Sequence, residues 1–192
     1  NQTESLLYLG IMHFYGYGVE KDHSKAKLYI ERAAANGNST AFINLGKLCF
    51  NERDYKQSEY YFEKAAEKND PEAFYLLANL YSNVGLNYKI DISKAIHYYT
   101  KCIEYDDKLH SIYNKYKYIA NNDLGLIYLI NFDDIETATQ FLKEAGLNEY
   151  PHGQNNLGLL YQFYLNNMGN ADYMYQRASK NNFALAQFNL GL

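Results

Sequence analysis

Residues 5–38 read "SLLYLGIMHFYGYGVEKDHSKAKLYIERAAANGN". Within this stretch, Gly16 and Gly18 bracket a tyrosine between two amphipathic segments. A phosphate-binding loop would need such glycines to follow a strand and to open a helix. Here they follow "ESLLYLGIMHFY", whose apolar residues recur at helical spacing, and neither GxGxxG nor GK[ST] is completed. We therefore expect the glycines to reverse the chain between two helices, with Val19 packing and Asp22 capping the second helix.

A Leu-Gly pair recurs along the chain. The pairs begin at Leu9, Leu45, Leu124, Leu157 and Leu190, and Leu77-Ala78 is a variant of the pair. Most intervals between these leucines lie between 32 and 36 residues. This period is typical of repeats built from helical hairpins.

A second pattern follows each Leu-Gly pair. In "AKLYIERAA" (26–34) and "SEYYFEKAA" (58–66), small, large, large and small residues occupy positions 0, +3, +4 and +7. The segments that begin at Ala95, Ala138 and Ala171 align with them without gaps. This spacing describes one face of an α-helix over two turns, so we expect two helices in each repeat. Because glycine inside a helix costs about 0.5–1 kcal/mol relative to alanine, its recurrence predicts a closely crossing neighbour helix.

Helix ends are marked by caps. Asp70-Pro71 is typical of an N-cap followed by an N1 proline, and Gly37 is a reasonable residue to follow a helix C-terminus. Asp54 with Gln57, and Asp133 with Glu136, have the spacing of capping boxes.

The first unit resembles the Sel-one-like (Sel1-like) repeat, a relative of the tetratricopeptide repeat. The family pattern is A-x-x-x-L-G-x-x-Y-x-x-G-x-G-V-x-x-D, followed by K-A-x-x-W/Y-Y-x-K-A-A-x-x-G. The chain matches it at Leu9, Gly10, Gly16, Gly18, Val19, Asp22, Lys25, Ala26, Tyr29, Ala33, Ala34 and Gly37. Later units depart from the glycine loop, but the resemblance covers nearly the whole chain. It implies an all-α fold, a right-handed superhelical solenoid of antiparallel helix-turn-helix repeats, with about five units and a partial sixth.

We expect residues 1–192 to form a single repeat array that is a fragment of a longer chain. Its units are roughly 5–40, 41–72, 73–108, 109–152 and 153–185, with a partial unit at 186–192. The insertion "LHSIYNKYKYI" (109–119) is either a lengthened first helix or a contact for a partner. The closing stretch "ALAQFNLGL" would leave apolar residues uncovered, and a homodimer through this edge is the alternative to a longer array.

Charge, apolar runs and cysteines limit the partners and the compartment that we expect. A net charge of -4 gives no reason to expect nucleic acid. Apolar runs such as "LGLIYLI" (124–130) are shorter than the ~20 residues that span a bilayer, so no membrane insertion is expected. Cys49 and Cys102 form neither a CxxC pair nor a metal-binding spacing, which favours packed thiols in a cytoplasmic, reducing compartment. A secretory location stays open, because the chain begins at Asn1 and an upstream segment could be missing.

Catalytic motifs are lacking in the sequence. The five histidines are scattered without an HExxH motif, and no GxSxG box is present. His13 takes the place that tyrosine holds in other repeats, which indicates packing. We expect no enzymatic activity, no catalytic residue, no cofactor and no metal.

The resemblance to tetratricopeptide repeats places a partner on the concave surface lined by the first helices. The residues that we expect to bind it are Ile43, Lys47, Asn51, Tyr75, Asn79, Asn83, Asn122, Asn155 and Gln162. Aromatic side chains supply contact area and amides bond an extended backbone, so the expected partner is a protein or peptide. The cationic clamp that reads acidic C-terminal tails is absent. Alternatively, apolar members of this set pack between first helices.

The expected function is a non-enzymatic scaffold or adaptor. The alternative is a cytoplasmic inhibitor of the immunity type, which neutralises a toxin or enzyme by direct binding. The resemblance also admits a hydrolase or small-molecule binder, since some cysteine-rich relatives are linked to β-lactam binding. Those relatives carry regular cysteine pairs within their repeats, and this chain does not.

Overall fold

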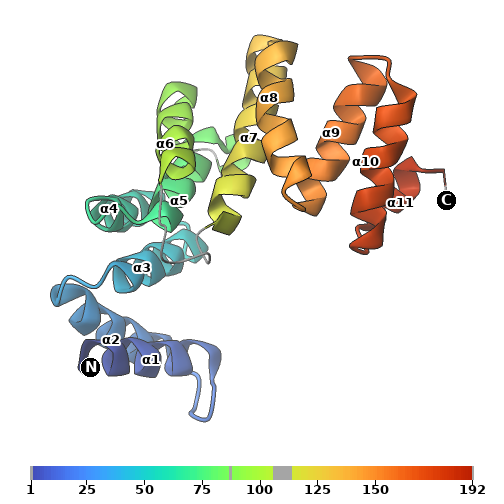
Figure 1. The fold of residues 1–192 in the computed structure, drawn as a ribbon. Coiled ribbons are helices and arrows are strands. Elements are labelled where there is room, and N and C mark those ends of the chain that lie inside the picture. Colours follow the sequence, from blue (N-terminus) through green and yellow to red (C-terminus); the bar gives the residue numbers. More distant parts are fainter. Residues whose placement is uncertain (1, 87, 106–113, 192) are drawn as a thin grey trace. The chain divides into compact units, whose positions relative to one another are not determined.

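The computed structural model describes residues 2–86, 88–105 and 114–191. Over these residues the chain forms eleven α-helices, one short 3-10 helix and no strand (Figure 1). The expectation of an all-α repeat solenoid is confirmed. The elements are α1 Gln2–Tyr15, α2 His23–Ala35, α3 Ser39–Asn51, α4 Tyr55–Ala66, α5 Pro71–Ser82, η1 Val84–Leu86, α6 Ile92–Glu104, α7 Asn114–Phe132, α8 Ile135–Leu147, α9 Pro151–Phe163, α10 Met168–Lys180 and α11 Ala184–Asn189.

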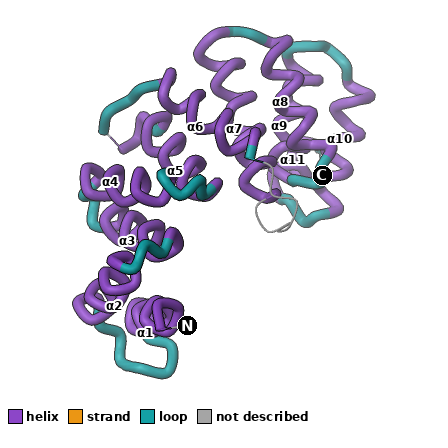
Figure 2. The backbone as a smooth tube through the Cα atoms, turned by 60° about the vertical axis from the view of Figure 1, so that its left-hand side comes forward, coloured by secondary structure: helices purple, strands orange, loops and turns teal. Residues whose placement is uncertain are grey.

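The chain divides into two compact units, each of which contains more than one repeat. Unit 1 consists of residues 1–98, and unit 2 consists of residues 99–192. In unit 1, α1 packs on α2 and α3 packs on α4, and in unit 2, α7 packs on α8 and α9 packs on α10. Figure 2 shows these pairs as antiparallel hairpins joined by short loops. Each unit is therefore a stack of hairpins in chain order. The arrangement of residues 1–192 as a single array stays a prediction.

Aspartates cap the starts of helices, and glycines form the turn after α1, where the sequence predicts them. Asp22, Asp54 and Asp70 each accept a hydrogen bond from a backbone N–H in the first turn of the helix that follows. Gly16 and Gly18 have φ values of 79° and 70°, in the left-handed region that favours glycine. The glycine pair after α1 is therefore a chain reversal, and Asp22 caps α2 as expected.

The cap of α8 differs from the prediction by one residue. Asp134, and not Asp133, accepts the hydrogen bond from the Thr137 N–H at 3.0 Å. Asp133 instead has a φ of 52° and belongs to the turn. Two consecutive aspartates satisfy the same local pattern, and the path of the turn decides which of them reaches the helix N-terminus.

Glycines of the first helices face large side chains of the second helices. A Cβ on Gly10 would lie 2.5 Å from Ile30 Cγ1, and a Cβ on Gly158 would lie 2.5 Å from Tyr175 Cε1. Real Cβ atoms do not approach other atoms so closely, so both positions require glycine unless a neighbour moves. The Leu-Gly pair thus has the packing role that its recurrence predicts.

Part of the predicted insertion lies in α7. Residues 109–113 are outside the described residues, and residues 114–119 form the first turns of this helix. With 19 residues, α7 is longer than the equivalent helix α9, which has 13. This part of the insertion therefore lengthens a first helix. A contact between the insertion and a partner stays a prediction.

Candidate functional site

A pocket of about 250 Å³ opens between α3 and α5 in unit 1. Its lining consists of Lys47, Phe50, Asn51, Phe62, Leu76, Asn79 and Asn83. We call it the unit-1 pocket. It brings together four residues that the sequence suggests for partner binding, which are Lys47, Asn51, Asn79 and Asn83.

The unit-1 pocket has an apolar interior and a polar rim. Phe62 is buried, and Phe50 and Leu76 are half-buried. Asn51 and Asn83 are exposed at the ends of their helices. A concave apolar surface with a few polar groups at its border is the usual composition of a binding site. Such a site suits a ligand that inserts an apolar side chain into the pocket while its main chain contacts the amides.

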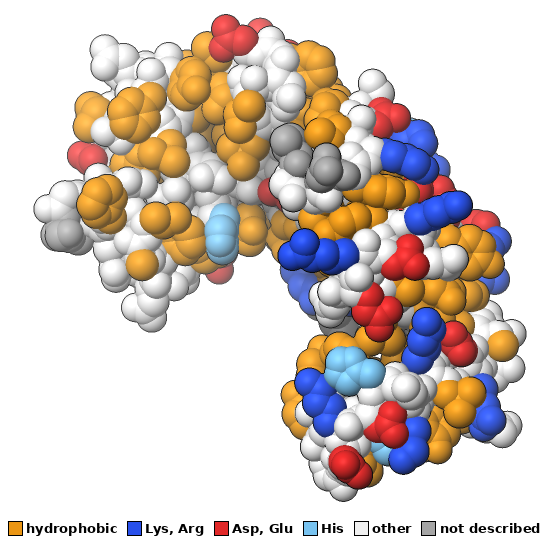
Figure 3. Space-filling view, turned by 180° about the vertical axis from the view of Figure 1, so that it is seen from behind, with side chains coloured by type: hydrophobic (Ala, Val, Ile, Leu, Met, Phe, Trp, Pro, Cys, Tyr) orange, Lys and Arg blue, Asp and Glu red, His pale blue; other side chains and the backbone are white. Residues whose placement is uncertain are grey.

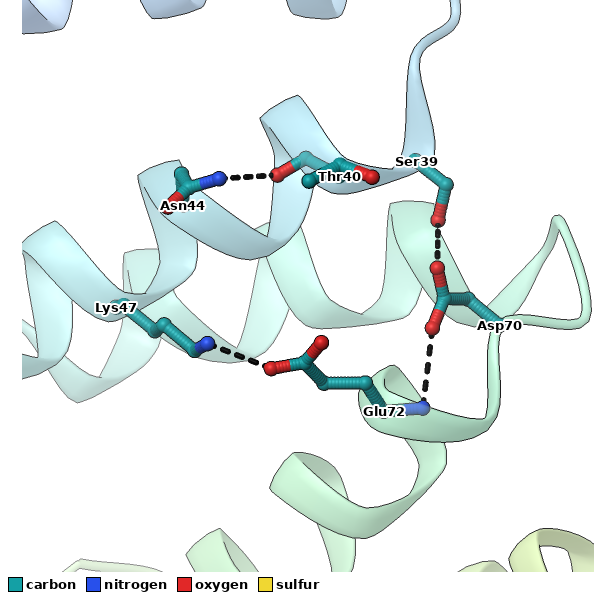
Figure 4. Close-up of polar contacts among 6 residues, drawn as sticks. All are labelled: Ser39, Thr40, Asn44, Lys47, Asp70 and Glu72. Carbon is teal, nitrogen blue, oxygen red and sulfur yellow. Dashed lines mark hydrogen bonds and ion pairs between the residues drawn. The ribbon is translucent and has the colours of Figure 1, made fainter. Parts of the chain in front are cut away.

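One cation borders the pocket and pairs with the next repeat. Lys47 Nζ of α3 lies 2.6 Å from Glu72 Oε1 of α5 (Figure 4). The Lys47 side chain remains 46% exposed. Glu72 lies in the first turn of α5, where a carboxylate interacts favourably with the helix dipole. The ammonium is therefore positioned by α5 and remains accessible to solvent.

Hydrogen bonds fix the start of α5 against α3. Asp70 Oδ2 accepts a hydrogen bond from Ser39 Oγ at 2.6 Å, and Asp70 Oδ1 accepts one from the Glu72 N–H at 3.0 Å (Figure 4). Burial raises the pKa of Asp70 above its usual value, although these hydrogen bonds oppose the shift. Because Asn79 lies on the same helix, the anchored N-terminus also positions one wall of the unit-1 pocket.

A second, smaller pocket adjoins the first. It has a volume of about 170 Å³ and lies between α1 and α3. It shares Lys47 and Asn51 with the unit-1 pocket and is also lined by Ile11, Phe14, Tyr15, Ile30, Asn44 and Leu48. Lys47 and Asn51 therefore stand on the α3 surface between two apolar recesses.

Two other predicted residues of unit 1 have different surroundings. Ile43 is only 2% exposed and belongs to a core cluster with Ala65 and Ala73. It is not accessible to a partner in this structure, and the alternative of packing between first helices describes it. Tyr75 is half-buried and does not belong to the lining of the unit-1 pocket.

Two predicted residues of unit 2 form hydrogen bonds between successive first helices. Asn122 and Asn155 are both buried. Asn156 Nδ2 donates to Asn122 Oδ1 at 2.9 Å, which joins α9 to α7. Asn189 Nδ2 donates to Asn155 Oδ1 at 2.9 Å, which joins α11 to α9. These amides therefore form a ladder inside the unit, and their side chains face the neighbouring helix.

Gln162, the remaining predicted residue, is half-buried on α9. Its Oε1 accepts a hydrogen bond from the Tyr175 hydroxyl group at 2.7 Å. This bond orients Gln162 within its own hairpin. Asn122, Asn155 and Gln162 therefore form hydrogen bonds within unit 2, and their binding of a partner stays a prediction.

The sequence did not reveal a buried carboxylate in unit 1. The hydroxyl groups of Tyr81 and Tyr88 donate to Glu59, and Lys89 Nζ lies 3.2 Å from Glu59 Oε2. Burial raises the pKa of Glu59, but the three donors outweigh burial, so the pKa lies below its usual value. Tyr88 and Lys89 belong to the loop between α5 and α6, so Glu59 of α4 holds this loop in place.

The described residues include no cluster of metal-ligating side chains and no membrane-spanning helix. Within them, no group of three or more His, Cys, Asp or Glu residues is arranged to hold a metal ion. No helix of the described chain is long and apolar enough to cross a bilayer. Cys49 and Cys102 are buried thiols, as their repeat positions predict.

Comparison with protein families gives a match over three segments. The family model of the Sel1 repeat matches residues 3–38, 44–70 and 71–103. No curated protein matches the sequence.

Similar architectures occur among solved structures. A Sel1 repeat protein from Oxalobacter formigenes is 26% identical, with a TM-score of 0.78 over 100% of this chain and 78% of that one. A protective antigen of uropathogenic Escherichia coli with an SLR fold is 24% identical, with a TM-score of 0.77 over 98% of this chain and only 40% of that one. An immunity protein from Pseudomonas aeruginosa is 17% identical, with a TM-score of 0.60 over 97% of this chain and 68% of that one.

Proposed function

Since the chain belongs to the Sel1 repeat family, we propose that it is a scaffold or adaptor that binds a protein or peptide in the unit-1 pocket. Sel1 repeats are generally non-enzymatic interaction modules. The observation that carries the proposal is the pocket itself, where Lys47, Asn51, Asn79 and Asn83 border an apolar interior.

The shape and chemistry of the pocket favour an extended peptide segment as the ligand. A volume of about 250 Å³ admits one bulky apolar side chain of such a segment. The side-chain amide of Asn51 can donate to and accept from its main chain. Asn83 Nδ2 can also donate to it, while Asn83 Oδ1 already accepts from the Gly85 N–H. Lys47 already pairs with Glu72, so a carboxylate on the ligand adds to binding without being required.

A peptide selection tests the proposal. Peptides selected from a displayed random library on the full chain are labelled, and their dissociation constants are measured by fluorescence anisotropy. The double variant Asn51→Ala/Asn83→Ala should bind at least about tenfold more weakly, because it removes both rim amides. Both residues are exposed, and the hydrogen bond from the Gly85 N–H to Asn83 Oδ1 that is lost is exposed too, so the melting temperature should change little.

The matched control is Asn148→Ala, which removes an exposed amide at the end of α8 in unit 2. It should leave the dissociation constant unchanged. Equal affinities for the double variant and the unchanged chain would refute binding in the unit-1 pocket. An equal loss of affinity in both variants would also refute it.

An inhibitor of the immunity type is the second candidate function. The likeness to an immunity protein is one of fold alone, since only 17% of residues are identical. The two candidates differ in the complex that they form. An inhibitor binds one partner tightly in a fixed stoichiometry, whereas an adaptor binds several. Cross-linking followed by analytical ultracentrifugation of the recovered complexes distinguishes them.

A homodimer through the C-terminal helix stays a proposal as well. Leu185 and Phe188 of α11 are exposed, and a second copy that covers them would bury apolar area. Sedimentation equilibrium should show dimerisation that Phe188→Ser abolishes. A monomer at every accessible concentration would contradict the proposal.

A further inference from the structure

Unit 2 exposes large apolar side chains where its hairpins turn. Ile130 and Phe132 at the end of α7, and Phe163 at the end of α9, are 74%, 55% and 70% exposed. Leu165 and Met168 follow α9 and are also exposed. We call these five residues the apolar edge. Exposed apolar residues that gather in this way mark interaction surfaces more often than scattered ones do.

The two turns lie at the same edge of unit 2. Figures 1 and 2 show the α7–α8 and α9–α10 turns on one side, and the α8–α9 turn on the opposite side. The turns are also closed alike, because the Asp134 N–H donates to Tyr128 O and the Asn167 N–H donates to Tyr161 O. Tyr128 and Tyr161 pack against the same core cluster. The apolar edge therefore draws on both hairpins of this unit.

The surroundings of the apolar edge are acidic. In the sequence, Lys143 is the only Lys or Arg between residues 118 and 176. Asp133 follows Phe132 directly in the sequence, and Glu136 lies four residues after it. Both carboxylates are exposed. Figure 3 shows hydrophobic side chains spread over the visible face of unit 2, with few charged ones among them. A ligand for this edge must therefore offer apolar contacts and carry positive charge at its border.

We propose that the apolar edge docks a cationic amphipathic segment of another protein. Bulky apolar side chains of the segment contact Ile130 and Phe163, and its Lys or Arg residues pair with Asp133 and Glu136. A bilayer fits less well, because binding to anionic headgroups requires basic residues that this edge lacks. The edge is separate from the unit-1 pocket, so a failure of one proposal leaves the other standing.

The probe is a labelled synthetic helix of about 18 residues, or five turns, with Leu and Phe on one face and Lys on the other. A second peptide carries Glu in place of every Lys. Fluorescence anisotropy with the full chain should show binding of the Lys peptide at least about tenfold tighter than that of the Glu peptide. Added salt should weaken the Lys complex, because it screens exposed charges.

Variants then map the binding to the edge. Ile130→Ser/Phe163→Ser should weaken binding of the Lys peptide at least about tenfold. The control Leu147→Ser removes an apolar side chain that is 54% exposed at the end of α8, on the opposite side of unit 2, and should leave binding unchanged. Asp133→Asn/Glu136→Gln should weaken binding and reduce its salt dependence, whereas Glu144→Gln on the exposed surface of α8 should not.

Several outcomes overturn the proposal. They are absent binding of the Lys peptide, equal binding of both peptides, and equal binding by the unchanged chain and the Ile130→Ser/Phe163→Ser variant. Sedimentation with vesicles of neutral phosphatidylcholine tests the bilayer. Binding to these vesicles that Ile130→Ser/Phe163→Ser abolishes would assign the edge to a membrane and would likewise overturn the proposal.

Discussion

Leu142 of α8 packs directly on the backbone of α7 at Gly125. A Cβ on this glycine would lie 2.8 Å from Leu142 Cγ and 3.2 Å from the carbonyl oxygen of Ala138. Leu142 is fully buried, so it has little room to move away. The close approach of the two helices offsets the cost of about 0.5–1 kcal/mol that glycine brings to a helix.

A larger side chain at this crossing should destabilise the protein. Gly125→Val should lower the free energy of unfolding by roughly 1–3 kcal/mol, because the added methyl groups force Leu142 or α8 to shift. Urea denaturation followed by circular dichroism measures the change. The control is Gly169→Val in the first turn of α10, where a Cβ would meet nothing closer than Asn167 Oδ1 at 3.9 Å. Equal stability of Gly125→Val and the unchanged protein would remove this explanation of the repeated glycine.

The crossing could be predicted from the sequence because the same pair of positions recurs. Gly46 faces Phe62 and Gly158 faces Tyr175 in the same way that Gly125 faces Leu142. Repetition of the glycine predicts a closely crossing helix, and the structure adds that the facing side chain stands at position +4 of the second-helix pattern. The cap of α8 has no such support. Two adjacent aspartates compete there, and the sequence pattern predicts the wrong one.

Glu59 should contribute to stability through its three donors. Glu59→Gln should lower the free energy of unfolding by about 1–3 kcal/mol, because hydrogen bonds to a charged acceptor are lost in a buried place. Thermal unfolding at pH 7 measures the effect. The control is Glu63→Gln on the same helix, which is exposed and should leave the melting temperature nearly unchanged.

The contribution of Glu59 should also depend on pH. Its pKa in the folded protein lies below the value of about 4.3 expected in the unfolded chain. The unfolded state therefore binds the proton first as the pH falls, and stability decreases. The difference in melting temperature between the unchanged protein and Glu59→Gln should be constant from about pH 7 to 5. It should shrink below about pH 4, and a difference that grows there would contradict the assignment.

No sequence pattern predicts this network. Glu59 lies beside the packed face of α4 that includes Ser58 and Phe62, at a position without a shared residue type in the other repeats. Tyr88 and Lys89 lie in a loop, where hydrophobic periodicity gives no information about position. The path of the chain after α5 brings them to the carboxylate, and only the structure shows that path.

The amide ladder of unit 2 should stabilise the packing of α9 on α7. Asn122→Ala and Asn156→Ala should each lower the free energy of unfolding by about 1–2 kcal/mol, because each leaves a polar partner unbonded. The double variant should lose less than the sum, with a coupling of at least about 0.5 kcal/mol. Asn122→Ala combined with Asn181→Ala, at the end of α10, should be additive. A coupling near zero for the first pair would mean that the bond contributes nothing.

The ladder also explains why only part of the candidate site could be predicted. Ile43, Asn122 and Asn155 all stand two residues before the leucine of their repeat. The structure turns this position toward the adjacent first helix, where Ile43 packs and the two asparagines bond. The spacing of residues on one helix identifies a face. It does not identify the angle at which the next helix crosses that face, and this angle separates buried positions from accessible ones.

Lys47 lies at an accessible position on α3, which makes it a useful probe of the unit-1 pocket. Lys47→Met should change the free energy of unfolding by less than about 1 kcal/mol, because the ion pair with Glu72 is partly exposed. The methionine keeps the length and apolar stem of lysine, so peptides selected on the pocket that carry a carboxylate should lose affinity and neutral peptides should not. Glu72→Gln should strengthen binding of the acidic peptides, because it frees the Lys47 ammonium. Urea denaturation and fluorescence anisotropy measure the two quantities. A loss of stability above about 2 kcal/mol in Lys47→Met would show that the cation holds α3 to α5 instead of serving a ligand.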